Sequence, residues 1–238
     1  GSIKAAPHRA RRYLGAVSGG SKRQDMLYVL PAVSVSFQKQ SANTVITSGN
    51  NTYQFTGATF DIFESGSGAR VGTIKMDSNG RAQATLLPNT AYYLVETKAP
   101  TGYVPRHDRI AFTTGNDGGR VAIDEQPGTI NLHIVKLDAA TNAGPQVGSS
   151  LAGAEFTCVS QSTPGWAQIL TTDESGRATL ADVPLGTFTI YESKAPEGYL
   201  PSNDSWTYTV GADQLGDSGV VEIESRVSDI PIAFNLEI

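Results

Sequence analysis

The sequence YYLVETKAPTGY at residues 92–103 returns 96 residues later as FTIYESKAPEGY at residues 188–199. Two further blocks repeat at the same offset, GATF at 57–60 with GAEF at 153–156, and DSNGRA at 77–82 with DESGRA at 173–178. Three matches in one register indicate an internal duplication. We therefore predict two copies of one domain, at residues 31–127 and 128–238, which follow a basic lead-in at residues 1–30.

Each copy has the pattern of short β-strands. Apolar residues alternate with polar ones where each copy begins, over residues 33–39 and 130–136. The repeated Asp-x-x-Gly block precedes a short alternating run, as in a hairpin turn. The proline of the repeated Ala-Pro-x-Gly-Tyr block ends a strand, because proline has no N–H to donate. Short strands without a helical period predict an all-β fold of two tandem β-sandwiches with little helix.

The composition excludes several classes of protein. Among 238 residues there are one cysteine, three scattered histidines and no apolar run long enough to cross a bilayer. The 25 glycines and 12 prolines suit a turn-rich β-protein better than a helical one. These features argue against a disulfide scaffold, a helical bundle and a metalloenzyme, and they predict neither a cofactor nor a metal.

The charge is unevenly distributed. Residues 1–25 hold six basic side chains against one acidic one, so the rest of the chain carries a net charge of −10 within a total of −5. An acidic body binds nucleic acid poorly, and we predict neither a nucleic-acid partner nor a membrane contact for this fragment. The opening Gly1-Ser2 is typical of a cloning scar, and the basic lead-in reads as a solvated segment or a strand completed by a neighbouring domain.

Two charged residues in each copy fall where the alternation requires core. Lys39 and Lys136 share the apolar face of the first strand, and Glu96 and Glu192 interrupt apolar strands. An unpaired buried charge is costly, so we expect lysine and glutamate to meet or to change protonation. Buried ion pairs are one outcome. A neutral amine and a protonated glutamic acid beside an Asn or Asp side chain would also suffice to form an intramolecular amide.

The repeated blocks resemble those of a known family. Tyr92–Tyr103 is similar to the E-box of Gram-positive pilins and surface adhesins, and VKLD at 135–138 and LAGAEF at 151–156 are similar to segments of collagen-adhesin B-type (CnaB) domains. The resemblance covers about residues 31–238. It implies immunoglobulin-like β-sandwiches of reversed topology, many of which form a spontaneous Lys–Asn or Lys–Asp isopeptide bond promoted by the E-box glutamate.

By this resemblance Lys39 and Lys136 are the nucleophiles, and Glu96 and Glu192 promote the reaction. Family acceptors lie on the last strand, beside the first. In copy two we expect residues 232–238 to form that strand, with Asn235 as acceptor, although the alternation points Asn235 away from the apolar face. In copy one the acceptor is Asp124, with Asn131 as a substitute, and a copy without any bond is a third possibility.

The function expected from these features is structural. We predict a pilin subunit or adhesin stalk on a Gram-positive cell wall, joined by sortase to other subunits and strengthened by isopeptide bonds that form once per molecule, so that it is not an enzyme. A second hypothesis is an adhesin head that binds a host extracellular-matrix protein or glycan, with non-covalent Lys/Glu pairs. An enzyme acting on an external substrate is weaker, because no nucleophile elbow or phosphate loop is present.

Overall fold

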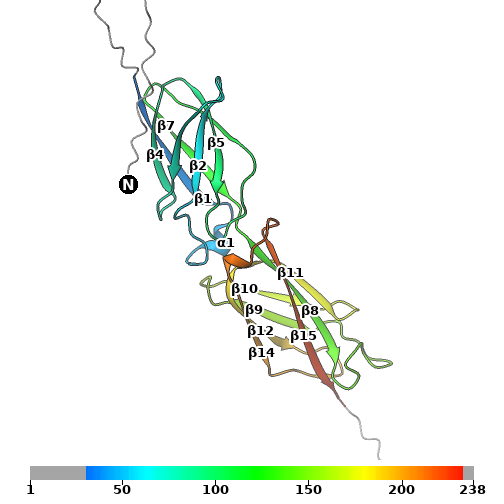
Figure 1. Ribbon diagram of the computed structural model, residues 1–238. Helices are drawn as coiled ribbons and strands as arrows, with labels where there is room; N and C mark the ends of the chain where they lie inside the picture. Colours follow the sequence, from blue (N-terminus) through cyan, green and yellow to red (C-terminus); the bar gives the residue numbers. More distant parts are fainter. Residues whose placement is uncertain (1–30, 233–238) are drawn as a thin grey trace, which may run out of the picture. The chain divides into compact units, whose positions relative to one another are not determined.

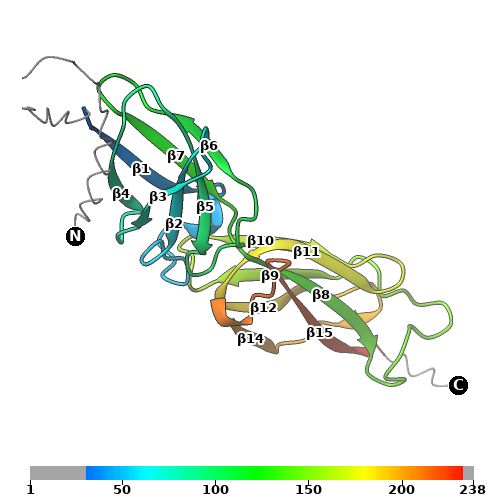
Figure 2. The same ribbon diagram turned by 45° about the horizontal axis from the view of Figure 1, so that its top comes forward.

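The computed structural model of the protein describes residues 31–232, and the lead-in and Asn235 lie outside that range. Four β-sheets form two tandem β-sandwiches (Figures 1 and 2), which confirms the predicted all-β fold. In the described part the helical elements are α1 (Thr44–Thr47) and the single 3₁₀ turn η1 (Ala212–Gln214). No helix in that part is long and apolar enough to cross a membrane.

The first sandwich packs a three-stranded sheet, of order β4-β1-β7, against a four-stranded sheet, of order β3-β2-β5-β6. Its strands are β1 (Val33–Ser41), β2 (Thr59–Glu64), β3 (Arg70–Lys75), β4 (Arg81–Leu86), β5 (Ala91–Lys98), β6 (Ile110–Thr113) and β7 (Gly119–Glu125). Val35 and Phe37 on β1 are 1% exposed and pack with Phe60 and Leu94 of the opposite sheet. The alternation on β1 therefore fills the core as predicted.

The second sandwich joins a sheet of order β11-β8-β15-β13 to one of order β10-β9-β12-β14. Its strands are β8 (Thr129–Asp138), β9 (Glu155–Ser160), β10 (Ala167–Thr171), β11 (Arg177–Pro184), β12 (Gly186–Lys194), β13 (Tyr199–Leu200), β14 (Ser205–Val210) and β15 (Val220–Pro231). β15 runs parallel to β8 over its whole length, from Val220 beside Thr129 to Asp229 beside Asp138. The last described strand thus lies beside the first strand of its copy, as the family resemblance implies.

The compact units do not coincide with the repeat. The second unit contains residues 124–238 together with 41–54 and 99–105 of copy one. Tyr53 helps to hold this unit together, because its hydroxyl donates to the carbonyl of Gly128 (2.8 Å) and accepts from the N–H of Leu185 (2.9 Å). Burial raises the pKa of Tyr53 to about 12. Two segments of copy one therefore belong to the same compact unit as copy two.

The Tyr53→Phe variant tests this attachment. It leaves a buried carbonyl and a buried N–H without their partner, and each such loss costs about 1–3 kcal/mol. We expect urea unfolding of the second unit to show a loss of about 2–4 kcal/mol. Tyr208→Phe, at a partly exposed tyrosine of the same unit, is the matched control and should change stability little. Equal effects of the two substitutions would contradict this role of Tyr53.

Candidate functional site

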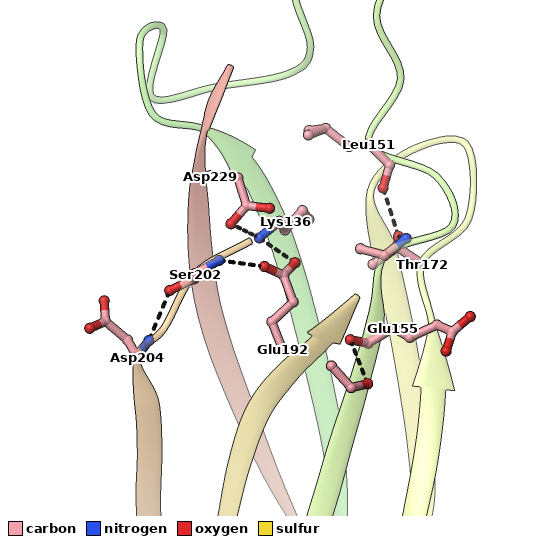
Figure 3. Close-up of polar contacts among 10 residues, drawn as sticks. Lys136, Leu151, Glu155, Thr172, Glu192, Ser202, Asp204 and Asp229 are labelled. Atoms are coloured by element: carbon pink, nitrogen blue, oxygen red, sulfur yellow. Dashed lines mark hydrogen bonds and ion pairs between the residues drawn. The ribbon is translucent and has the colours of Figure 1, made fainter. Parts of the chain in front are cut away.

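Three buried charged side chains meet inside the second sandwich. Lys136 Nζ lies 2.7 Å from Glu192 Oε1 and also contacts Asp229 Oδ1 (Figure 3). All three side chains are 0% exposed. The predicted pair of Lys136 and Glu192 is therefore present, and a carboxylate that the sequence analysis did not single out completes the cluster.

The lysine is placed by the alternation of β8. Ile130, Leu132 and Ile134 are buried on the same face, and Lys136 continues that row. Behind it, the backbone N–H of Lys136 donates to the carbonyl of Gly176 (2.8 Å) at the Asp-x-x-Gly turn. Gly176 has φ +72°, and a Cβ there would lie 3.1 Å from the Lys136 carbonyl oxygen. The repeated glycine is thus required for the turn to close against the lysine.

A β-bulge follows each E-box glutamate. Phe156 pairs with Glu192 but Glu155 pairs with Lys194, so one extra residue is accommodated on β12. The same shift occurs in copy one, where Phe60 pairs with Glu96 and Thr59 with Lys98. A bulge changes the direction of the side chains around it. Because the bulge recurs in both copies, we infer that the E-box sequence helps to set the direction of the glutamate side chain.

The third group comes from the long pairing of β15 with β8. Val227 lies beside Lys136, and Asp229, two residues further, has the same inward direction. The backbone carbonyl of Asp229 accepts from the N–H of Ala139 (2.8 Å), which fixes the end of β15. The parallel register therefore places the Asp229 carboxylate in contact with Lys136, although Lys136 is paired directly with Val227.

The surroundings of the cluster raise the pKa of Glu192. Burial is the largest influence on Glu192 and raises its pKa, and the nearby Asp229 carboxylate acts in the same direction against the lowering effect of Lys136. Among the described residues, neither oxygen of Asp229 receives a hydrogen bond, and Lys136 Nζ meets Glu192 Oε1 as an ion pair. Lys136 Nζ also lies 5.4 Å from the centroid of the Phe156 ring. Buried charges so placed have no solvent and few donors to stabilise them.

Copy one repeats part of this arrangement. Lys39 Nζ lies 2.8 Å from Glu96 Oε1, with side-chain exposures of 0% and 2%. The second oxygen of Glu96 accepts from the N–H of Arg106 (2.7 Å), as that of Glu192 accepts from the N–H of Ser202 (2.8 Å). Phe60 lies under Lys39 Nζ at 4.5 Å. The lysine and glutamate predicted for copy one therefore also meet.

The acceptor predicted for copy one, Asp124, is not the buried acidic residue at the end of β7. Asp124 is exposed on β7, whereas the next residue, Glu125, is 1% exposed. The N–H of Ala42 donates to the carbonyl of Glu125 (2.8 Å), just as that of Ala139 donates to Asp229. Since Ala42 and Ala139 each follow the lysine by three residues, Glu125 is the counterpart of Asp229. The substitute Asn131 bonds the exposed Glu222 (2.9 Å), away from the buried cluster.

Asn235 lies outside the described residues, and the sequence offered a signal for Asp229 instead. Glu125-Gln-Pro127 matches Asp229-Ile-Pro231, and Asn131 and Asn235 each follow the proline of their copy by four residues. The offset of this match is 104 residues rather than 96. Because the last strand of copy two was expected at residues 232–238, Asp229 fell outside the expected acceptor strand.

The single cysteine and the buried Trp166 have ordinary structural roles. Cys158 is 0% exposed, and burial raises the pKa of its thiol to about 12, as in a core residue. Trp166 is 7% exposed, so its ring packs inward rather than forming a ligand platform. Within residues 31–232, no group of three His, Cys, Asp or Glu side chains is arranged to hold a metal ion.

The family model of the SpaA prealbumin-like fold domain matches residues 40–127 and again residues 131–224. The chain belongs to this family. The two SpaA-type matches reproduce the duplication read from the E-boxes, and the resemblance to pilin and adhesin domains is confirmed. No curated protein sequence matches the chain.

The chain is also similar to solved structures of proteins from Bacillus and Lactobacillus. The Bacillus anthracis TIE protein is similar over 84% of this chain and 34% of its own, with 22% identity and a TM-score of 0.60. A C-terminal fragment of the pilus adhesin SpaC from Lactobacillus rhamnosus GG matches 85% of this chain and 99% of its own, with 17% identity and a TM-score of 0.47. BcpA, the major pilin subunit of Bacillus cereus, matches 85% of this chain and 100% of its own, with 14% identity and a TM-score of 0.35. This chain spans about a third of the TIE protein, and identities this low show a shared fold only.

Proposed function

We propose that this chain is a load-bearing segment of a pilus or adhesin stalk whose second sandwich closes itself with an isopeptide bond between Lys136 Nζ and Asp229 Cγ. The observation that carries the proposal is the buried contact of Lys136 with a carboxylate that has no hydrogen bond within the described residues. Amide formation removes both charges from the core, and with them the cost of burying them.

The reaction is a condensation in which Glu192 moves the protons. Neutral Lys136 Nζ attacks Cγ of the Asp229 carboxyl group, and the new C–N bond forms as a C–O bond breaks. The neutral amine loses one hydrogen, which leaves with the hydroxyl of the protonated Asp229 carboxyl group as one water. Glu192 Oε1, 2.7 Å from Nζ, can accept a proton from the amine and return one to the departing oxygen. The raised pKa of Glu192 suits this exchange.

The position of the bond suits a chain under tension. Force that enters at Thr129 would run along β8 to Lys136, cross the amide to Asp229 and leave at Pro231. Residues 137–228 would then lie outside the loaded path. Unlike a disulfide, an amide is not reduced, which fits a protein with one cysteine.

Copy one supports a more modest assignment. Its Lys39–Glu96 ion pair is as buried as the pair in copy two, but Asp124 is exposed and the acceptor position of Asp229 corresponds to Glu125. We assign copy one a buried ion pair and copy two the covalent bond. This role implies other pilus or stalk subunits as partners and a location of the protein on the cell wall.

An intact mass under denaturing conditions tests the proposal. One Lys–Asp bond removes one water, so the wild-type chain should weigh about 18 Da less than its sequence requires. Digestion should yield a branched peptide that joins the segments around Lys136 and Asp229. An unmodified mass would refute the bond. A deficit of about 36 Da would mean that copy one also condenses, and mapping would then separate Glu125 from Asp124 as its acceptor.

A further inference from the structure

The end of β15 that carries Asp229 is held from both sides. On one side the N–H of Ala139, which follows β8, donates to the Asp229 carbonyl (2.8 Å). On the other side β13 pairs with β15, with Tyr199 beside Pro231 and Leu200 beside Ile230. The acceptor strand thus ends between β8 and the short strand β13 of the same sheet.

A hydrogen bond joins β8 and β13, the strands on either side of the acceptor strand. The Tyr199 hydroxyl, on β13, donates to Asp138 Oδ2, on β8, at 2.9 Å. Asp138 is 0% exposed and Tyr199 is 4% exposed. Since Asp138 lies two residues beyond Lys136 on the same face, this bond occupies the layer of the core next to the Lys136 cluster.

Hydrogen bonds to the Asp138 carboxylate favour its ionised form. Its Oδ1 accepts from the N–H groups of Ala140 (2.7 Å) and Thr141 (3.1 Å), and Gln146 Nε2 lies 3.2 Å from Oδ2. Burial alone would raise its pKa, but the hydrogen bonds from Tyr199 and from the backbone outweigh burial and lower it. A charged acceptor makes the bond from Tyr199 stronger than one between neutral groups.

The segment that Tyr199 anchors also positions the glutamate. The N–H of Ser202, three residues after Tyr199, donates to Glu192 Oε2 at 2.8 Å (Figure 3). That bond leaves Oε1 directed at Lys136 Nζ. The short segment 199–202 therefore contacts both the end of the acceptor strand and the group that moves the protons.

We propose that Asp138 and Tyr199 form a latch that positions Asp229 and Glu192 for reaction with Lys136. The proposal rests on the isopeptide bond proposed above. The two are positioning residues, because neither contacts the reacting atoms. Copy one has Ser41 at the position of Asp138, two residues after Lys39, and its Oγ donates to the carbonyl of Asn43 (3.1 Å). In copy two the latch joins the last tyrosine of the E-box to the residue two positions after the lysine.

The rate of water loss tests the latch. The full chain is made by cell-free synthesis, translation is stopped, and intact masses are taken at intervals. Tyr199→Phe removes the hydroxyl that donates to Asp138. Because Asp229 and Glu192 would then be held less firmly against Lys136, the half-time of water loss should lengthen roughly 10- to 100-fold. Tyr191→Phe is the matched control, since Tyr191 precedes Glu192 on β12 but is 41% exposed. Its half-time should equal that of the wild-type chain.

Two further variants separate positioning from general stability. Asp138→Asn keeps an oxygen that can accept from Tyr199 and should restore most of the rate, whereas Asp138→Ala should be as slow as Tyr199→Phe. The double variant Asp138→Ala/Tyr199→Phe should be no slower than either single variant, because both remove the same bond. A merely structural role would lower the melting temperature of the matured protein and leave the half-time unchanged.

The outcomes also separate the latch from the bond. A wild-type chain that never loses water would refute the isopeptide bond and the latch together. A wild-type chain that loses water while Tyr199→Phe and Asp138→Ala keep its half-time would refute only the latch. Additive slowing in the double variant would also refute it, because the two residues would then act independently.

Discussion

The Asp229→Ala variant should keep its full sequence mass and should lose about 4–5 kcal/mol of stability in the second unit. An amide between Lys136 and Asp229 closes a loop of more than 90 residues, and a crosslink of that span removes entropy mainly from the unfolded chain. Without it, the melting temperature should fall by roughly 10–20 °C. Differential scanning calorimetry with an intact mass of the same sample measures both effects.

Asp229→Asn is the control that identifies the chemistry. Asparagine offers the same carbonyl carbon with ammonia as the leaving group, so this variant should still crosslink and weigh about 17 Da less than its own sequence rather than 18 Da. Its stability should remain close to that of the wild type. A mass deficit that persists in Asp229→Ala would show that another residue is the acceptor.

The strands and the buried charges could be predicted because their signals are local. Alternation along residues 33–39 and 130–136 determines which side chains face the core, and it holds in the structure on both β1 and β8. Lys136 and Glu192 were recognisable because they interrupt an apolar face. A charge in such a position needs a partner wherever the strands pack, so the pairing followed without knowledge of the topology.

The acceptor that we propose, Asp229, depends on long-range pairing and was not predicted from the sequence. Which carboxylate meets Lys136 is decided by the register of β15 on β8, and that register has no periodic signature in the sequence. The attachment of residues 41–54 to the second unit has the same origin. The bonds of Tyr53 to Gly128 and Leu185 join residues that no sequence repeat relates.

A sandwich that closes itself, as we propose for copy two, must arrange its reacting groups before it reacts. In copy two the repeated glycine, the bulge after Glu192 and the parallel register of β15 all converge on Lys136. Each also serves the fold, so folding itself assembles the cluster. Copy one has the glycine and the bulge as well, and it differs at the position equivalent to Asp229. The difference between the copies therefore lies in the acceptor rather than in the scaffold.

The Glu192→Gln variant should slow formation of the bond by about 100- to 10,000-fold, the usual effect of removing a general acid–base. Glutamine has nearly the same shape and can still accept from the Ser202 N–H, but it cannot take a proton from Lys136 and return it to the leaving oxygen. Freshly purified protein should therefore carry its full mass. Over days at 25 °C the mass should fall slowly, if at all, and the melting temperature should be close to that of Asp229→Ala.

Two matched substitutions make this result specific. Glu155→Gln changes a glutamate on β9 that pairs with the exposed Lys194 at 3.3 Å, and it should leave the water loss of copy two intact. Glu96→Gln changes the equivalent residue of copy one and should also leave it intact. Rapid water loss in Glu192→Gln would mean that burial and proximity alone drive the condensation, because Lys136 and Asp229 are already in contact. In that case the role of Glu192 would be limited to excluding water from the contact between Lys136 and the acceptor strand.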